Sequence, residues 1–440
     1  MSRIGLIGEN SIEYIHTLLD IWNSQDCAVL IDWRIPYQTA IEMMNQACVH
    51  KCYIEKKVLD KFQAEKPTDI EMIPFEKKSN SAELLPDDIY HKFKGNYTKR
   101  EAIVLYSSGT TGKAKGIILT HYAINKNADA IIDYMQPTEK DRIYIAKTIS
   151  HSSTITGELL VALKTNMKAV IAPTIVLPRV VLNNIEKFHV TIICLNPTLL
   201  LLYAEELSFS GFEVNTLRSV YVSGSVLQNK TYEYAKKFFP CPIYNVYGLT
   251  EAGPRVTAQR IDCCNKNSVG RPIKNVLIKI LDEDKKEVGQ YERGIVFIKT
   301  QSAYTGYIEG DERNKPFYQG WLNSGDIGYF DEKNELNIVG RYDDLIIINS
   351  HKIYPGDLEK KINSIEGVIE NKVVKIMNEK GDEVICCAYV GQATPKEIKN
   401  ELLKNCIYYE IPQFYRCIKS IPKTMNGKYY MNTIKELFVK

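Results

Sequence analysis

Short apolar runs alternate with helical stretches along the N-terminal half of the chain. The clearest pairs of an apolar run and a following helical stretch are 4–7 with 11–22, 28–31 with 37–48, and 169–172 with 180–188. Apolar runs of this length are typical of buried strands, and their alternation with helices is typical of strands that run parallel. The pattern therefore predicts α/β layers built on largely parallel sheets.

The pattern shifts twice further along the chain. After Asp262 the strands become short and are interrupted by turn residues, so we interpret 275–307 as a smaller β-rich subdomain. After Arg341 a compact α+β unit is predicted from four segments: 357–365, 373–377, 384–390 and 395–405. A chain of 440 residues with 45% hydrophobic content exceeds what one core usually holds, so we expect two or more domains.

Residues 106–116 combine hydroxyls, glycines and two lysines in one turn. Backbone amides in such a turn can cradle a polyphosphate. The turn is not a Walker loop, because only two residues separate Gly109 from Gly112, and it joins the strand-like segments 102–106 and 117–120 instead of opening a helix. Taken alone, the turn is equally compatible with a plain hairpin.

Charge and hydropathy exclude several classes of function. The net charge of +3 comes from interspersed basic and acidic residues, which argues against nucleic-acid binding and against a polybasic membrane anchor. No apolar run approaches the roughly 20 residues of a transmembrane helix. Glu9 and Glu13 interrupt the start of the chain where a signal peptide would be apolar. We therefore expect a soluble, cytoplasmic protein with no membrane span and no nucleic-acid partner.

The eleven cysteines are odd in number and include no Cys-x-x-Cys pair. Their doublets at 263–264 and 386–387 fit neither a disulfide framework nor a zinc site. We expect reduced thiols, several of them filling core positions as small hydrophobic groups.

Four further motifs follow the phosphate-type loop in a fixed order: 245–251, 321–326, 340–344 and 422–428. Together with the loop, they resemble the ordered core motifs of the adenylate-forming superfamily, which contains acyl-CoA synthetases, peptide-synthetase adenylation domains and luciferases. The resemblance implies a large ATP- and acid-binding domain over residues 1–341. It also implies a small mobile C-terminal domain over residues 342–440, joined to the large domain by a hinge.

The resemblance assigns the phosphate loop and its lysine. The residues that would supply donors to the β- and γ-phosphates of ATP are Ser107, Ser108, Gly109, Thr110, Thr111 and Gly112. Lys115 falls at the lysine of the family pattern, and Ala114 replaces the usual proline, which costs some loop rigidity without removing the function. These groups would stabilise the charge that accumulates on the phosphates during acid activation.

The second motif implies a metal ligand and contacts to the nucleotide. Glu251 matches the family's magnesium ligand, and Thr250 would contact the α-phosphate as a second catalytic residue. Tyr247 would stack on adenine, beside Asn245 and Gly248, although ordinary core packing is the alternative for the tyrosine. In the third motif, Asp326 matches the carboxylate that holds the ribose hydroxyls, with Arg341 nearby; otherwise Asp326 is a turn residue.

The last motifs imply the C-terminal catalytic groups. Lys428 matches the lysine that bridges the carboxylate and the α-phosphate during adenylation, as opposed to an ordinary surface lysine. Asp343 matches the hinge between the adenylating and the thioester-forming arrangements. Ser350 stands where the family usually has a glycine close to the incoming pantetheine, so a side chain here would narrow the thiol tunnel.

The acid pocket is expected around His151, which aligns with a histidine of many acyl- and aryl-CoA synthetases. Ser153 stands where peptide-synthetase domains place an aspartate that pairs with the ammonium of an α-amino acid. An unpaired buried ammonium is costly, so an aryl or fatty acid is favoured over an α-amino acid. Gly224 and Ser225 are further predicted lining residues.

The predicted function is ATP- and Mg²⁺-dependent activation of a carboxylic acid to acyl-AMP, followed by transfer to the pantetheine thiol of coenzyme A or a carrier protein. Ser350 keeps open an enzyme that stops at acyl-AMP or uses another acceptor, and luciferase-type oxidation shares the same motifs. A non-catalytic nucleotide-binding scaffold is a further alternative. The leading segment that usually covers part of the large domain in the family is absent. A partner would bury the surface that this segment covers, or the surface would stay exposed. The oligomeric state stays open.

Overall fold

The computed structural model describes residues 1–62, 69–108, 114–174, 176–263, 265–308, 317–348, 351–378, 381–423 and 429–439, without the side chains of 107, 108 and 114. The chain divides into two compact units. The first comprises 1–223, 229–278 and 298–322, and the second comprises 224–228, 279–297 and 323–440. No described helix is long and apolar enough to cross a membrane.

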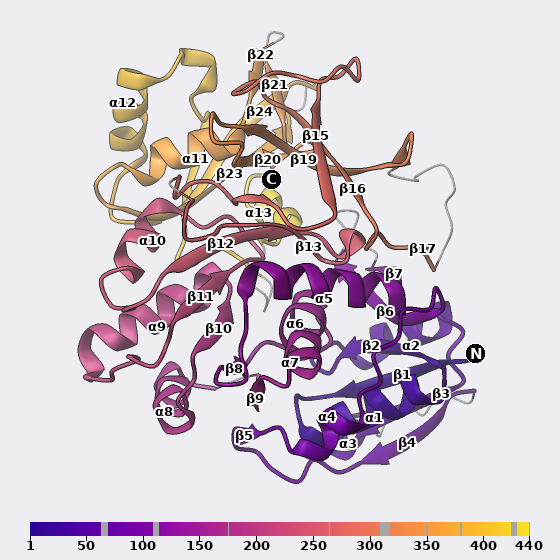
Figure 1. The fold of residues 1–440 in the computed structure, drawn as a ribbon. Helices are drawn as coiled ribbons and strands as arrows, with labels where there is room; N and C mark the ends of the chain where they lie inside the picture. Colours follow the sequence, from indigo (N-terminus) through magenta and orange to yellow (C-terminus); the bar gives the residue numbers. More distant parts are fainter. Residues whose placement is uncertain are drawn as a thin grey trace. The chain divides into compact units, whose positions relative to one another are not determined.

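The first unit contains a seven-stranded sheet of order β17-β7-β6-β2-β1-β3-β4. Its strands are β1 (Arg3–Gly8), β2 (Cys27–Asp32), β3 (Lys51–Glu55), β4 (Glu71–Phe75), β6 (Glu101–Ser108), β7 (Ala114–Thr120) and β17 (Gly306–Tyr307). The neighbouring strands β6, β2, β1, β3 and β4 run parallel, whereas β7 pairs antiparallel with β6 and with β17. Helices α1 (Ile12–Asn23), α2 (Tyr37–Gln46), α3 (Lys56–Lys61) and α4 (Asp87–Lys92) connect them (Figure 1). Ala40, Met43 and Met44 of α2 are buried in one core cluster with apolar residues of these strands.

A second sheet in this unit has the order β14-β13-β12-β11-β10-β8-β9-β5. Its strands are β5 (Glu83–Leu84), β8 (Arg142–Ile145), β9 (Lys168–Ile171), β10 (Ile192–Leu195), β11 (Ser219–Val222), β12 (Ile243–Gly248), β13 (Arg255–Ala258) and β14 (Arg271–Pro272). The neighbouring strands β9, β8, β10, β11 and β12 run parallel. The helices are α5 (His121–Met135), α6 (Ser152–Thr154), α7 (Leu160–Thr165), α8 (Pro178–Phe188), α9 (Pro197–Ser210) and α10 (Asn229–Ala235), with the π-helical turn η1 (Ile155–Leu159) between α6 and α7.

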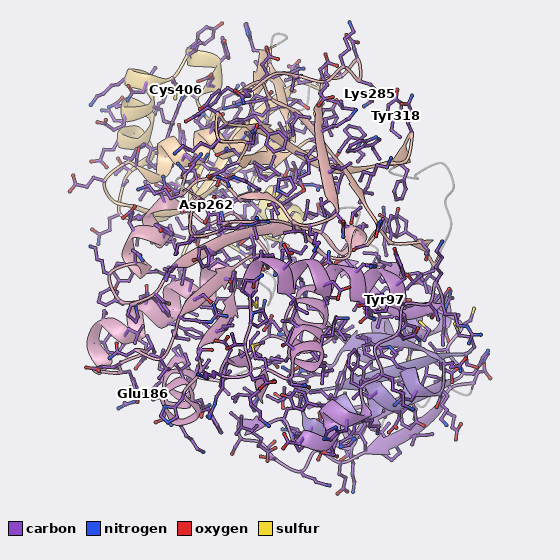
Figure 2. The ribbon with its side chains drawn as sticks, in the orientation of Figure 1. Tyr97, Glu186, Asp262, Lys285, Tyr318 and Cys406 are labelled. Atoms are coloured by element: carbon purple, nitrogen blue, oxygen red, sulfur yellow. The ribbon has the colours of Figure 1, made fainter. Side chains whose placement is uncertain are left out.

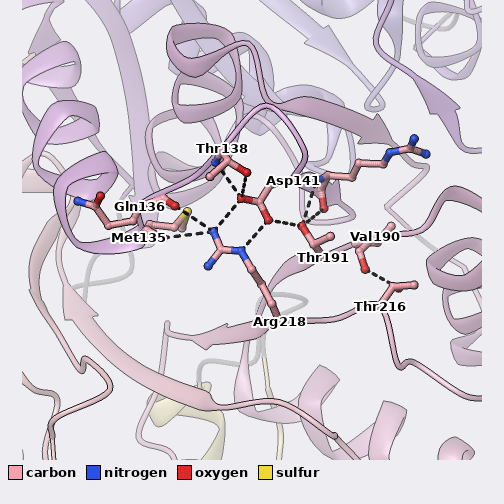
Figure 3. A network of polar contacts seen from close by, with 9 residues as sticks. Met135, Gln136, Thr138, Asp141, Val190, Thr191, Thr216 and Arg218 are labelled. Atoms are coloured by element: carbon pink, nitrogen blue, oxygen red, sulfur yellow. Dashed lines mark hydrogen bonds and ion pairs between the residues drawn. The ribbon is translucent and has the colours of Figure 1, made fainter.

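An ion pair between Asp141 and Arg218 joins the end of α5 to this second sheet (Figure 3). Arg218 Nε and Nη2 lie 2.6 Å and 3.0 Å from the two carboxylate oxygens, and Nη2 also donates to the carbonyls of Met135 and Gln136. Thr191 donates its hydroxyl to Asp141 at 2.8 Å. Burial raises the pKa of Asp141, but the hydrogen bonds from Arg218, Thr138 and Thr191 lower it by more, so the net pKa is below the ordinary aspartate value. The network therefore stabilises the ionised carboxylate.

The second unit contains the C-terminal part of the chain. A five-stranded sheet, of order β15-β16-β19-β18 with β20 paired to β19, has residues in both units; its strands are β15 (Val276–Leu281), β16 (Gly294–Thr300), β18 (Phe317–Tyr318), β19 (Trp321–Phe330) and β20 (Leu336–Arg341). A hairpin of β21 (Ile346–Ile348) and β22 (His351–Ile353) follows. The last sheet is formed by β23 (Val368–Met377), β24 (Glu383–Gly391) and β25 (Phe414–Cys417).

Alternate residues of β23 and β24 belong to two apolar clusters. One cluster includes Leu358 and Ile362 of α11 (Pro355–Asn363) and Ile398 and Leu402 of α12 (Pro395–Asn405), and the other includes Ile434 of α13 (Met431–Glu436). This period of two is the alternation expected of strands covered on both faces. The predicted α+β unit is therefore present.

The observed elements confirm the predicted fold class of α/β layers, a β-rich segment and a C-terminal α+β unit. The thiols also follow the prediction. All ten cysteines of the described ranges are free, and six of them are buried. Figure 2 labels one of the others, Cys406, which is partly exposed. The predicted mobile boundary between 341 and 342 stays a prediction.

Candidate active site

The strand–loop–strand arrangement predicted for the phosphate loop is confirmed on both flanks. Strands β6 and β7 pair antiparallel, with Ser107 opposite Lys115. The remaining predicted loop residues Gly109, Thr110, Thr111 and Gly112 lie outside the described residues, as do the side chains of Ser107 and Ser108. Lys115 itself is exposed on β7. An ammonium at the base of the hairpin is therefore accessible to an anionic ligand.

Tyr307 connects Lys115 to Glu251. Strand β17 pairs with β7 so that Tyr307 lies opposite Ile117, and Lys115 Nζ lies 5.5 Å from the centre of the Tyr307 ring. The Tyr307 hydroxyl donates a hydrogen bond to Glu251 Oε1 at 3.2 Å. The aromatic ring thus faces a cation and its hydroxyl faces a carboxylate. Sequence reasoning missed Tyr307, because β17 has only two residues and its pairing with β7 spans almost two hundred positions.

The hydroxyl of Tyr307 stays protonated at neutral pH. Burial raises the pKa of Tyr307, and the nearby Glu251 carboxylate raises it further because a phenolate would repel it. Tyr307 is therefore a permanent donor that fixes one oxygen of Glu251. A backbone bond of 2.9 Å from the Tyr304 amide to the Glu251 carbonyl holds the same segment in place.

Glu251 and Thr250 lie in the short 3₁₀ turn η2 (Thr250–Ala252), directly after β12. The turn requires Gly248, because a Cβ at this position would lie 2.0 Å from the Pro254 carbonyl oxygen. Tyr247 is partly buried near the end of β12. Asn245 is buried, and its side-chain amide donates to the Ser268 carbonyl at 3.1 Å. In this structure Asn245 therefore orders the strand end, and its contact with adenine stays a prediction.

The predicted acid-pocket histidine lies next to η2. Ser152, which follows His151, shares a 2.9 Å hydrogen bond with the Thr250 hydroxyl. His151 Nδ1 lies 3.0 Å from Ser153 Oγ and accepts from the Ser153 amide, which caps α6. The structure thus brings His151, Ser153, Thr250 and Glu251 into one region of the first unit.

Asp326 and Arg341 form a pair within the second unit. They lie opposite each other on β19 and β20, and Arg341 Nη1 lies 3.0 Å from Asp326 Oδ1. Gly325 has a φ of +68°, and a Cβ there would lie 2.7 Å from Arg341 Nη2. Glycine is therefore needed both for the backbone conformation and for the approach of the guanidinium.

The other predicted residues are more scattered. Asp343 lies in an exposed turn after β20, within the second unit. Gly224 and Ser225 also belong to the second unit, whereas His151 belongs to the first, so their place in an acid pocket stays a prediction. Ser350 and Lys428 lie outside the described residues.

The described residues contain no group of three or more His, Cys, Asp or Glu side chains arranged to hold a metal ion. Glu251 stays the magnesium ligand that the sequence predicts. This fits magnesium in nucleotide enzymes, because Mg²⁺ usually takes one or two carboxylates and completes its shell with phosphate oxygens and water.

Comparisons with known proteins identify the family of the chain. A family model described as AMP-binding enzyme matches residues 1–308. A 4-coumarate–CoA ligase of Humulus lupulus is 28% identical over 73% of this chain and 62% of its own length. A fatty acid–[acyl-carrier-protein] ligase, ScoC of Streptomyces coeruleorubidus, is 24% identical over 99% of this chain and 86% of its own length. The chain spans 62–64% of the length of the first 4-coumarate–CoA ligases that it matches.

Solved structures share the fold. ATP-bound MatB from Rhodopseudomonas palustris superimposes with a TM-score of 0.89 at 20% identity, over 99% of this chain and 88% of that chain. The anthranilate CoA ligase AuaEII with anthranoyl-AMP gives 0.86 at 18% identity, with coverage of 99% and 87%. The family match extends over more than half of the sequence, so the chain belongs to the AMP-binding enzyme family, as its resemblance to adenylate-forming enzymes predicted.

Proposed function

We propose that this chain activates a carboxylic acid with ATP and Mg²⁺ to acyl-AMP, releases pyrophosphate, and passes the acyl group to a pantetheine thiol. The observation that carries the proposal is the arrangement of Lys115, Tyr307 and Glu251, with Thr250 directly before Glu251. A cation, a fixed carboxylate and a hydroxyl are the groups that a polyphosphate needs when charge builds on it.

In the first half-reaction a carboxylate oxygen of the acid attacks the α-phosphorus, and the bond from that phosphorus to the bridging oxygen of the β-phosphate breaks. Lys115 would hold the phosphates by its charge, and Thr250 would donate to an α-phosphate oxygen. Glu251 would hold Mg²⁺, which when bound neutralises charge on the phosphates. Asp326 would hold the ribose hydroxyls, kept in orientation by Arg341 at 3.0 Å.

In the second half-reaction the thiol loses its proton, its sulfur attacks the acyl carbon, and the acyl–phosphate bond breaks to release AMP. Lys428 would act in the first step only, and Asp343 would be the hinge between the two steps. The acceptor is coenzyme A or a carrier protein. Relatives of both kinds match this chain, the CoA ligase of Humulus lupulus and the acyl-carrier-protein ligase ScoC.

The proposal is tested by acid-dependent exchange of labelled pyrophosphate into ATP, measured with aryl, short-chain, long-chain and α-amino acids. Exchange that requires both an acid and Mg²⁺, with coenzyme A giving a thioester and AMP, supports it. Exchange without thioester formation on either coenzyme A or a phosphopantetheinylated carrier would restrict the function to adenylation. ATP binding without exchange for any acid would favour a nucleotide-binding scaffold.

A further inference from the structure

Arg255 is a buried cation beside the candidate active site. It is only 4% exposed, and its Nε has no hydrogen-bond partner among the described residues. Its backbone is fixed at both ends, because the Asn127 side chain of α5 accepts from the Arg255 amide at 3.0 Å and donates to its carbonyl at 2.9 Å. A buried, positioned and incompletely paired guanidinium is costly unless something else satisfies it.

The surroundings of Arg255 do not supply enough negative charge. Glu158 of η1 is fully buried, and it already pairs with Lys147, whose Nζ lies 2.9 Å from Glu158 Oε1. Burial raises the pKa of Glu158, while Lys147 and Arg255 act in the opposite direction. The three side chains carry a net charge of +1 if Glu158 is ionised and +2 if it is protonated. Either way the cluster keeps an excess positive charge.

A neighbouring polar group is also incompletely satisfied. The Tyr134 hydroxyl of α5 is buried beside the Arg255 guanidinium without a well-formed hydrogen bond in the described parts of the chain. Burial raises the pKa of Tyr134 to about 12, and the nearby Arg255 guanidinium opposes that rise. Elements α5, η1 and β13 pack together around this region. Buried polar groups are normally hydrogen-bonded, so the unpaired Arg255 Nε beside this hydroxyl indicates that a ligand completes their hydrogen bonds.

The backbone of η1 lies close to the Arg255 guanidinium. At Gly157, in η1, a Cβ would lie 3.3 Å from Arg255 Nη2, which is tighter than an ordinary contact. π-helical turns such as η1 are rare in proteins, and those that occur often lie at functional sites. Any larger residue at position 157 would press on the guanidinium, so glycine allows the η1 backbone to lie this close to Arg255.

The position of Arg255 relates this cluster to the acid. In the β12–β13 pairing Arg255 lies opposite Gly248, two residues before Thr250. Helix α6, which leads directly into η1, begins after His151 and carries Ser152, the hydrogen-bond partner of Thr250. The elements that hold the reacting groups therefore also hold the cationic cluster.

We infer that Arg255 binds a second anionic group on the acid, so that the substrate class is a dicarboxylic acid whose far carboxylate pairs with this guanidinium. The inference rests on the proposed function and narrows its substrate. A planar guanidinium matches a carboxylate in a bidentate pair, and the Tyr134 hydroxyl beside it is a suitable additional donor. The excess positive charge is then neutralised only when the substrate is bound.

The test compares acids matched in length. Malonate, succinate, glutarate and adipate are measured against propionate, butyrate, pentanoate and hexanoate, and the three benzenedicarboxylates against the matching toluates, by pyrophosphate exchange. We expect at least one diacid to have a higher kcat/KM than its monocarboxylic analogue. Arg255→Leu should lower that ratio about 10- to 100-fold, the effect of losing one charge-assisted bond. Arg255→Lys should keep part of it.

Arg142→Leu is the matched control. Arg142 is a partly buried arginine of the same unit that donates to the Phe188 carbonyl at 2.8 Å, outside the cluster. Its loss should leave the diacid preference unchanged. If Arg255→Leu does not fold, Arg255→Lys and Tyr134→Phe carry the comparison, each with a lowered diacid ratio expected.

The outcomes separate the inference from the proposed function. Exchange that favours the monoacids, with a ratio unaffected by substitution of Arg255, overturns the inference and leaves acid activation standing. If none of the tested acids supports pyrophosphate exchange, the proposed function is overturned. In that case thermal shifts with the same diacids decide the binding site: Arg255-dependent stabilisation supports it, and its absence overturns it.

Discussion

Replacing Tyr307 by phenylalanine removes one hydroxyl and leaves the ring in place. The hydroxyl donates to Glu251 Oε1 at 3.2 Å, whereas the ring contacts Lys115 and lies 4.9 Å, centre to centre, from the Tyr304 ring. The substitution thus separates the orientation of the candidate magnesium ligand from the packing around it. We expect Mg²⁺-dependent turnover to suffer while the fold is retained.

The magnitude follows from the geometry. Loss of a partner that orients a metal ligand typically costs 10- to 100-fold in metal affinity. At 3.2 Å the bond is slightly longer than the usual range of O–H···O hydrogen bonds, so the lower figure applies. We therefore expect the Mg²⁺ concentration for half-maximal pyrophosphate exchange to rise about tenfold, or about 1.4 kcal/mol, and the melting temperature to change by only a few degrees.

The assay is a magnesium titration of exchange at saturating ATP and acid, with thermal unfolding alongside. Tyr97→Phe is the matched control, because Tyr97 also donates to a carboxylate, Asp129 Oδ2 at 2.8 Å, but lies on an exposed part of the same unit (Figure 2). An unchanged magnesium titration for Tyr307→Phe, or an equal shift for Tyr97→Phe, would refute the orienting role.

Four further predictions concern other parts of the account. Glu251→Gln should weaken Mg²⁺-dependent exchange far more than folding; a collapse of the melting temperature would instead indicate a structural role. Lys428→Ala should abolish adenylation but largely spare thioester formation from supplied acyl-adenylate, and equal loss of both half-reactions would contradict two-state use of the C-terminal domain. Because the folded pKa of Asp141 is lowered, its pairing with Arg218 stabilises the fold above the ordinary aspartate pKa of 3.8, and this contribution is lost as the pH falls below that value. Arg218 is 39% exposed, so the pair is weaker than a fully buried one. Asp141→Asn should therefore cost about 2 kcal/mol at neutral pH and flatten the acid limb in urea unfolding; parallel pH profiles would contradict this. Ser350→Gly should speed thiol transfer and leave exchange unchanged, whereas an unchanged or slower transfer would show that the serine does not obstruct the tunnel.

The fold was more accessible from the sequence than the site. Apolar runs such as 28–31 and helical stretches such as 180–188 mark elements whose burial pattern is local, and the structure has β2 and α8 at these positions. The motif around Glu251 could be found for the same reason, since its residues are contiguous. Tyr307 could not, because its role depends on a pairing between distant strands. Arg255 could not, because its role depends on burial among groups from other elements, which no local pattern encodes.

The most direct test of the central claim follows oxygen from the acid to AMP. An acid that supports exchange is labelled with ¹⁸O in its carboxylate and converted with ATP, Mg²⁺ and coenzyme A or hydroxylamine as acceptor. Attack of the carboxylate on the α-phosphorus predicts one labelled oxygen in the AMP and none in the pyrophosphate. Label in inorganic phosphate with ADP as the other product, or unlabelled AMP, would contradict activation through acyl-AMP.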